Sequence, residues 1–92
     1  MKEINIASAQ FQTRNGDKEY NLSRIDTLTA EAAGKGAQVV SFHEMSISSY
    51  SYTSKLSRTE MFELAEEVPS GASTRQMIRI AGKYNVALLA GL

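Results

Sequence analysis

The chain has 92 residues, which is enough for one compact domain. Its ten Lys and Arg residues balance ten Asp and Glu residues, so the charge pattern argues against a nucleic-acid-binding surface and against a polybasic membrane patch. Cysteine is absent, which excludes a disulfide, a thiolate metal site and a cysteine nucleophile within these residues.

The first predicted element is a strand that begins at Ile4 and ends at Phe11. One face carries Ile4 and Ile6, and the other carries Ala7, Ala9 and Phe11. A strand with apolar residues on both faces is typical of a layered α/β sheet, in which both faces are covered.

A helix is predicted after the Asn-Gly turn, with Asp17 as its N-cap. Its apolar stripe recurs every three or four residues: Leu22, Ile25, Leu28 or Thr29, Ala32 and Ala33. Gly34 and Gly36 mark the expected helix end, and the uncharged stretch Gln38–Phe42 follows as a buried strand. Strand, helix and strand in about forty residues predict a parallel βαβ unit.

The second half of the chain predicts a loop, two helices and a strand. Residues 45–58 are rich in serine and have no clear period, a pattern that is often functional. The apolar faces expected for the two helices are Met61, Leu64, Ala65 and Val68, and then Met77, Ile78, Ala81 and Tyr84. Ser73 or Thr74 is expected to cap the second helix, and Val86–Leu92 forms a third buried strand. The predicted order is β-α-β-α-α-β.

Glu44 is the strongest catalytic candidate, because it comes just after the apolar stretch Val39–Phe42, at the carboxyl end of a predicted parallel strand. Ligand-binding and catalytic groups gather at those strand ends in open α/β sheets. A carboxylate there can act as a general base. We therefore expect its side chain to face a cleft; a solvated loop carboxylate is the alternative.

Other chemistry finds less support. His43 is the sole histidine, and a metal site needs three or four ligands, so we interpret it as a loop histidine that orients its neighbours. Gly34-Lys35-Gly36 ends a helix instead of opening one, which disfavours nucleotide binding. Residues 70–74 open a helix without the P-loop lysine, and they indicate helix capping rather than anion binding. A G-x-S-x-G elbow is absent.

Several segments together resemble the nitrilase, or carbon–nitrogen hydrolase, superfamily. In chain order they are the first strand with Gln10, Gly16-Asp17 with Asn21-Leu22, residues 36–44, Tyr50, and residues 73–91. The second segment is similar to the family's G-D-x-x-x-N-L helix start, and the third is similar to the stretch that leads into F-P-E. The segments follow one another at family-like spacing over essentially the whole chain.

The resemblance implies an α-β-β-α sandwich and a Glu-Lys-Cys triad that hydrolyses small amides, nitriles or carbamoyl amines without a metal or an organic cofactor. Only the Glu carries over, onto Glu44. None of Lys35, Lys55 and Lys83 stands in the matching lysine motif, and there is no cysteine. We therefore expect residues 1–92 to be the truncated N-terminal part of a single hydrolase domain.

The chain departs from the family pattern at two positions beside Glu44. His43 replaces the usual Pro, and Ser49 replaces the usual Gly before Tyr50. Because Pro and Gly restrict or free backbone angles, we expect the loop after Glu44 to take a different path, and the substrate class stays open.

The parent enzyme is expected to be homo-oligomeric and to have no nucleic-acid or membrane partner. It is also expected to be cytoplasmic, since the first residues lack the apolar core of a signal peptide. Two alternatives stay open: a small flavodoxin-like α/β binding module without chemistry, and a regulatory or structural association fragment. A lysine motif followed by a cysteine in the downstream reading frame would separate the hydrolase from both.

Overall fold

The structure is a computed structural model that describes residues 3–49 and 52–92. Its elements are β1 (Ile6–Ala9), α1 (Lys18–Gly34), β2 (Val39–Phe42), the short 3-10 helix η1 (Thr53–Lys55), α2 (Arg58–Leu64), α3 (Ala72–Tyr84) and β3 (Ala87–Leu89). The predicted order of strands and helices is confirmed, although the strands are shorter than expected. The three strands form one parallel sheet in the order β1-β2-β3.

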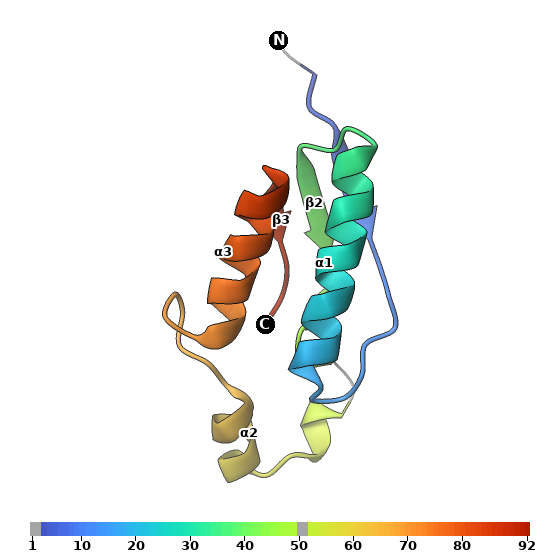
Figure 1. Cartoon of the computed structure of the whole chain (residues 1–92). Helices are drawn as coiled ribbons and strands as arrows, with labels where there is room; N and C mark the ends of the chain where they lie inside the picture. Colours follow the sequence, from blue (N-terminus) through green and yellow to red (C-terminus); the bar gives the residue numbers. More distant parts are fainter. Residues whose placement is uncertain (1–2, 50–51) are drawn as a thin grey trace.

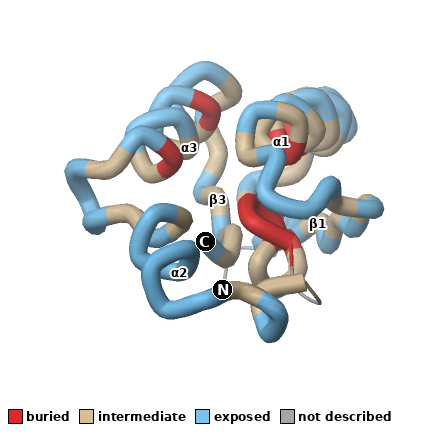
Figure 2. Tube along the Cα trace, turned by 90° about the horizontal axis from the view of Figure 1, so that it is seen from below, coloured by how far each residue is buried: buried red, intermediate tan, exposed pale blue. Residues whose placement is uncertain are grey.

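Helices α1 and α3 lie side by side over one face of the sheet (Figure 1). The strand register places Ala7, Val40 and Leu88 in one row across the sheet. This row packs with the helices in a core of five buried residues: Ile25, Val40, Phe42, Ile47 and Ile80. Figure 2 shows that the buried positions follow α1, α3 and the central part of the chain near β2. The central strand is therefore the best-covered strand, and it leads directly to Glu44.

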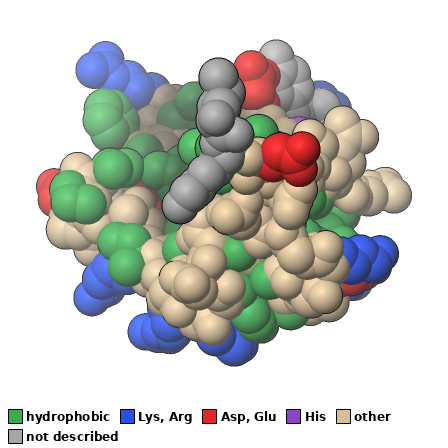
Figure 3. Space-filling view, turned by 90° about the horizontal axis from the view of Figure 1, so that it is seen from above, with side chains coloured by type: hydrophobic (Ala, Val, Ile, Leu, Met, Phe, Trp, Pro, Cys, Tyr) green, Lys and Arg blue, Asp and Glu red, His purple; other side chains and the backbone are tan. Residues whose placement is uncertain are grey.

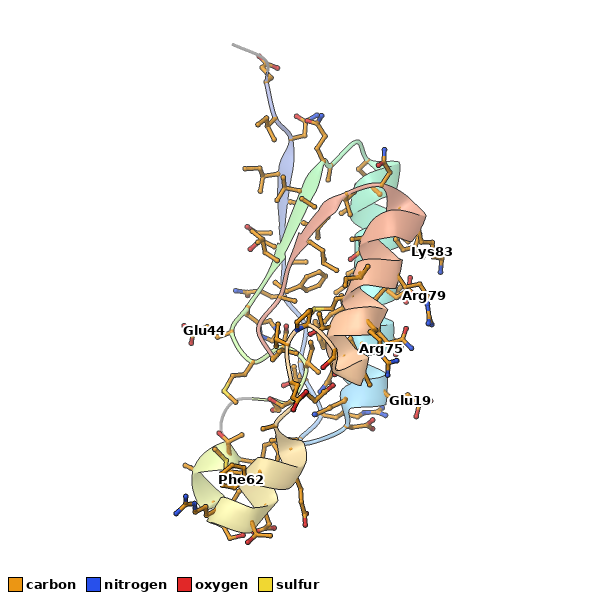
Figure 4. The ribbon with its side chains drawn as sticks, turned by 90° about the vertical axis from the view of Figure 1, so that its left-hand side faces the viewer. Glu19, Glu44, Phe62, Arg75, Arg79 and Lys83 are labelled. Atoms are coloured by element: carbon orange, nitrogen blue, oxygen red, sulfur yellow. The ribbon has the colours of Figure 1, made fainter. Side chains whose placement is uncertain are left out.

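The other face of the sheet has no covering layer among the described residues. Ile6 on β1 is 66% exposed and Leu89 on β3 is 58% exposed, whereas both strands were expected to be covered on both faces. Figure 4 shows α1 and α3 on one side of the strands and α2 beyond their lower end. Figure 3 shows hydrophobic side chains that reach the surface at the end of the molecule near the N-terminus. The observed unit has two layers, one helical and one of parallel strands.

The helix ends follow local capping chemistry. The predicted N-cap is confirmed, because the Asp17 carboxylate accepts a hydrogen bond from the Tyr20 N–H at 3.0 Å. Helix α1 ends at Gly34, and Gly36 has a φ of 91°. Helix α2 begins with a capping box, in which Ser57 and Glu60 each bond to the other's backbone N–H. The prediction that this helix carries Ala65 and Val68 on its apolar face is wrong, since the helix ends at Leu64.

Two expectations for the later helices are wrong, because packing on the sheet selects the buried face of α3 and because α2 buries none of its residues. Ile78 is 62% exposed, and Ile80 occupies the buried position in its place. On α2, Met61 is exposed, and Val68, which lies beyond the end of that helix, is also exposed. Both sets of residues fit a three- or four-residue spacing, so the periodicity alone does not decide which set faces the sheet.

The N-terminus of α3 is capped from outside the helix. Its N-cap is Gly71, whose backbone makes no side-chain capping bond, so the expectation of Ser73 or Thr74 as the cap is wrong. Glu66 instead accepts hydrogen bonds from the Ser73 N–H, at 2.7 Å, and from the Ser73 hydroxyl. Lys18 at the start of α1 forms an ion pair with the same carboxylate at 2.7 Å. Glu66 thereby joins α1 to the positive end of α3.

These contacts make the fold sensitive to acid. Burial by itself raises the pKa of the Glu66 carboxyl, but the hydrogen bonds from Lys18 and Ser73 and the charge of Lys18 outweigh it and lower the pKa from 4.5 to about 2. Because the pKa is lowered in the folded chain, the carboxylate stabilises the fold above pH 4.5, and this contribution is lost as the pH falls toward 2.

We expect Glu66→Gln to lower the free energy of unfolding at neutral pH by about 2 kcal/mol, because the amide cannot replace the charged acceptor. Urea unfolding at a series of pH values measures the effect, and the gap between the two proteins should narrow below pH 4.5. Glu67→Gln is the matched control, since Glu67 is exposed and meets only Ser70, at 3.2 Å. A gap that stays constant down to pH 3 would contradict the assignment.

Candidate functional site

Glu44 lies two residues beyond the carboxyl end of β2, the central strand, as predicted. The expectation that it faces a cleft is wrong for this chain: Glu44 is exposed, and Figure 4 shows it pointing away from the helices. A cavity of about 250 Å³ is lined by the neighbouring Met45, Ile47 and Ser48, but not by Glu44. A larger one, of about 870 Å³, lies between α1 and α3 beside Lys18 and Glu66. The carboxylate is thus held at the edge of the sheet on its uncovered side.

The backbone that carries Glu44 forms a tight turn over residues 44–49. Met45 and Ser49 have φ values of 48° and 79°, in the left-handed region, and the Ser49 N–H donates to the Met45 carbonyl oxygen at 2.9 Å. Residues 46–49 are buried, although three of the four are serines. A left-handed conformation in residues other than glycine persists only where the surroundings impose it. The turn is therefore held by contacts with other segments.

The chain beyond β3 supplies one of these contacts. The Gly91 carbonyl oxygen accepts hydrogen bonds from the Ile47 N–H and from the Ser46 hydroxyl, both at 3.3 Å. A Cβ at position 91 would lie 2.6 Å from the Met45 nitrogen and 3.2 Å from the Glu44 Cα. Only a glycine lets the backbone approach the turn so closely.

The start of α1 supplies a second contact, through the residues of the G-D-x-x-x-N-L pattern. The side chain of Asn21 is fully buried and makes three hydrogen bonds: it accepts from the Arg14 N–H at 2.9 Å, and it donates to the carbonyl oxygens of Arg14 at 2.9 Å and Ile47 at 2.7 Å. The Gly16 N–H donates to the Ser48 carbonyl oxygen at 3.0 Å. The pattern therefore joins the loop before α1 to the turn after Glu44.

Ser49 shows what the departure from the usual Gly does. Its φ of 79° is the conformation that glycine favours, so at this residue the backbone keeps a glycine-like path. The Ser49 hydroxyl accepts a hydrogen bond from Thr13 at 2.8 Å and donates one to Asn15 at 2.9 Å. The expectation of a different path is therefore wrong at this position, and the serine adds contacts that a glycine lacks. Tyr50 lies outside the described residues.

The His43 ring contacts two backbone segments, the one that follows β1 and the one that follows β2. Its Nε2 lies 3.1 Å from the carbonyl oxygen of Phe11, and its Nδ1 lies 3.0 Å from the carbonyl oxygen of Glu44. The ring also packs on the Phe11 ring, with centroids 5.2 Å apart. These contacts match the interpretation of His43 as a residue that orients its neighbours.

The remaining candidate groups are not brought to Glu44. Lys35, the residue after α1, pairs with Glu31 on that helix, and Lys83 on α3 pairs with Asp26 on α1. Across residues 3–49 and 52–92, no cluster of three His, Cys, Asp or Glu side chains could hold a metal ion. The same residues include no helix with both the length and the apolar character needed to cross a membrane.

The sequence predicted the position of Glu44 at the end of β2, but it did not predict that Asn21 and Gly91 contact the turn that follows. Asn21 is in phase with the buried residues Ile25 and Thr29, at steps of four along α1. Most buried polar side chains in proteins are hydrogen-bonded; Asn21 follows this rule, whereas the buried Thr29 hydroxyl has no partner among the described residues. The close approach of Gly91 has no comparable signal in the sequence.

Comparisons of the sequence with known proteins identify the family of this chain. A model of the carbon–nitrogen hydrolase family matches residues 5–92, so the chain belongs to the carbon–nitrogen hydrolase family. The chain is 28% identical, over 96% of its length, to a protein named nitrilase from Pyrococcus abyssi. It is also 28% identical, over 96% of its length, to a citrullinase from Francisella tularensis. It spans 32% and 30% of the lengths of these two relatives.

Proposed function

We propose that this chain supplies the general base of a carbon–nitrogen hydrolase that acts on small amide, nitrile or carbamoyl substrates. The observation that carries the proposal is the placement of Glu44, on a turn at the carboxyl end of the central strand that three other segments hold in place. Holding a base in a fixed geometry is what general base catalysis requires. The proposal adds a cysteine nucleophile and a lysine from outside these residues.

For an amide substrate, Glu44 accepts the thiol proton of the cysteine, and the thiolate sulfur forms a bond to the carbonyl carbon. The lysine stabilises the negative charge on the substrate oxygen. The C–N bond then breaks, and the protonated Glu44 returns its proton to the leaving amine. Glu44 next accepts a proton from water, whose oxygen attacks the thioester carbon. The C–S bond then breaks, the acid is released, and Glu44 returns the proton to the cysteine sulfur.

The uncovered face of the sheet fits a place in an α-β-β-α sandwich. Apolar residues such as Ile6 and Leu89 line this face, and burying them would contribute about 25 cal/mol for each Å² removed from water. We propose that a second sheet of the enzyme packs there, and that its edge turns the exposed surroundings of Glu44 into a cleft. In this proposal the second sheet covers Glu44, so the carboxylate of Glu44 is exposed to solvent when the sheet is absent.

We propose no substrate more specific than the three classes named above. One relative is named for nitriles and the other for citrulline, so similar segments serve different C–N bonds. The cytoplasmic location and the homo-oligomeric state stay predictions. A non-catalytic α/β binding or association module is the second candidate, and the exposed apolar sheet face is the observation that favours it.

We expect the 92-residue chain alone to release no ammonia from amides, nitriles or ureido compounds above background, because it contains no cysteine. A longer protein that contains this segment, with the lysine and the cysteine, is expected to turn over at least one of these classes. Ammonia release by the two proteins, measured side by side, tests the proposal. Turnover by the chain alone that disappears in Glu44→Gln would overturn the cysteine mechanism.

A further inference from the structure

We propose that the uncovered face of the sheet is an interface between two copies of this chain, which pack face to face about a two-fold axis. Side chains alternate between the two faces of a strand, and Ala7, Val40 and Leu88 pack toward the helices. The strand register therefore places six side chains on the other face: Ile6, Ser8, Val39, Ser41, Ala87 and Leu89. The inference concerns the 92-residue chain by itself, so it does not rest on the proposed catalysis.

This face is uncharged, and its outer strands expose large apolar side chains. None of the six residues is charged, so two copies of the face meet without bringing like charges together. Ile6 on β1 and Leu89 on β3 are both exposed, and so is Ile4, two residues before Ile6. Removing these side chains from water favours association.

Large and small side chains occupy opposite corners of the face. Ile6 and Ala87 stand at the two ends of one row, and Ser8 and Leu89 stand at the two ends of the next row. The two large residues thus lie on one diagonal and the two small ones on the other. A two-fold axis between two stacked sheets, along or across the strands, turns one diagonal onto the other. Each large residue of one copy therefore meets a small residue of its partner, as in a well-packed core.

Glu44 decides between these two orientations of the axis. Its side chain is exposed beyond the end of β2 and points away from the helices (Figure 4). An axis along the strands would bring the Glu44 carboxylates of both copies to the same end of the dimer, where they repel. An axis across the strands places them at opposite ends, and it sets Ile6 against the partner's Ser8 and Leu89 against the partner's Ala87. The two sheets therefore pack with their strands aligned and antiparallel.

The interface is small, because the strands have four, four and three residues. Interfaces below the standard size form weak, reversible complexes, so we expect a Kd on the order of 10 μM. In the proposed enzyme a second sheet occupies this face, so only the 92-residue chain is expected to pair in this way.

The first test is sedimentation velocity of the 92-residue chain over a concentration series that reaches about 0.5 mM. We expect a reversible shift from monomer to dimer. Leu89→Lys should raise the Kd at least about a hundredfold, because it buries an unpaired charge in the interface. Ile78→Lys is the matched control, since Ile78 is an exposed residue on α3, in the helical layer, and its dimer should equal that of the wild type.

Two results of this test would overturn the inference. One is a monomer at every concentration. The other is a dimer that survives in Leu89→Lys, with circular dichroism showing that the variant is folded. Because neither measurement involves turnover, the inference and the proposed function fail independently of each other.

The second test concerns the fit of large against small residues. Ala87→Leu adds apolar area to the face, but it sets a leucine against the partner's Leu89. We expect the Kd to rise about tenfold, because overpacking outweighs the added area. Tighter association of Ala87→Leu would indicate unspecific hydrophobic contact and would overturn the proposed packing.

The third test concerns the orientation and uses mixtures of two variants. Ala87→Glu and Leu89→Lys should each be monomeric alone, and an equal mixture should form a heterodimer. In that heterodimer the introduced lysine faces the introduced glutamate, and the other contact between positions 87 and 89 stays natural. A mixture of Ser8→Glu with Leu89→Lys should stay monomeric. Pairing in the second mixture alone would contradict the antiparallel orientation, and pairing in neither would overturn the interface.

Discussion

In the proposed hydrolase, replacing Glu44 by Gln is expected to lower kcat by about a thousandfold, the range of a lost general base. The amide keeps the shape of the carboxylate, but it cannot accept the thiol proton. Folding should be unaffected, because the Glu44 side chain is exposed and forms no hydrogen bond or ion pair within the described residues. Steady-state rates of ammonia release and a thermal melt measure both expectations.

Two further variants serve as controls for the effect of Glu44→Gln on kcat. Glu63→Gln is the matched control, since Glu63 is an exposed carboxylate on α2 that belongs to no proposed machinery, and its rate should equal that of the wild type. Glu44→Asp keeps the base but withdraws it by one methylene, so an intermediate rate is expected. Wild-type turnover in Glu44→Gln would show that another group removes the proton.

Asn21→Ala is expected to lower the free energy of unfolding by about 3 kcal/mol, since it removes the hydrogen bonds that a fully buried side chain makes to three backbone groups. The three groups are the N–H of Arg14, the carbonyl of Arg14 and the carbonyl of Ile47. The side chain of Asn21, which is fully buried, bonds to all three. Urea unfolding with an unchanged m-value measures the loss. The same variant should loosen the turn that carries Glu44, which gives it an effect on kcat in the enzyme.

Ser23→Ala is the control on the same helix. Ser23 is exposed and bonds only to the Tyr20 carbonyl oxygen, at 2.6 Å, so a change within about 0.5 kcal/mol is expected. If Asn21→Ala were as mild as Ser23→Ala, the network through Asn21 would not hold the turn.

The order of the elements was predictable because local rules define it. Apolar periodicity predicts α1, the uncharged stretch predicts β2, and Asp17 predicts the start of α1. The position of Glu44 at the end of β2 follows from the same reasoning.

Contacts between distant segments were not predictable in the same way. Ile80 replaces Ile78 in the core because the docking of α3 on the sheet, and not its spacing, selects the buried face. Glu66 caps α3 from seven residues away, and Gly91 meets the Glu44 turn across 47 residues of chain (91 minus 44). Glu44 is exposed because no segment among the described residues covers the neighbouring face of the sheet, and a local sequence pattern does not indicate such long-range coverage.

The most direct test of the account is the rate at which the enzyme's cysteine becomes acylated in a single turnover, followed by mass spectrometry of the quenched protein. With Glu44 present, the thioester is expected to form before the acid is released, because the carboxylate generates the thiolate. In Glu44→Gln the thioester should form about a thousandfold more slowly. Acylation of Glu44→Gln at the wild-type rate would contradict the role of Glu44 as the general base.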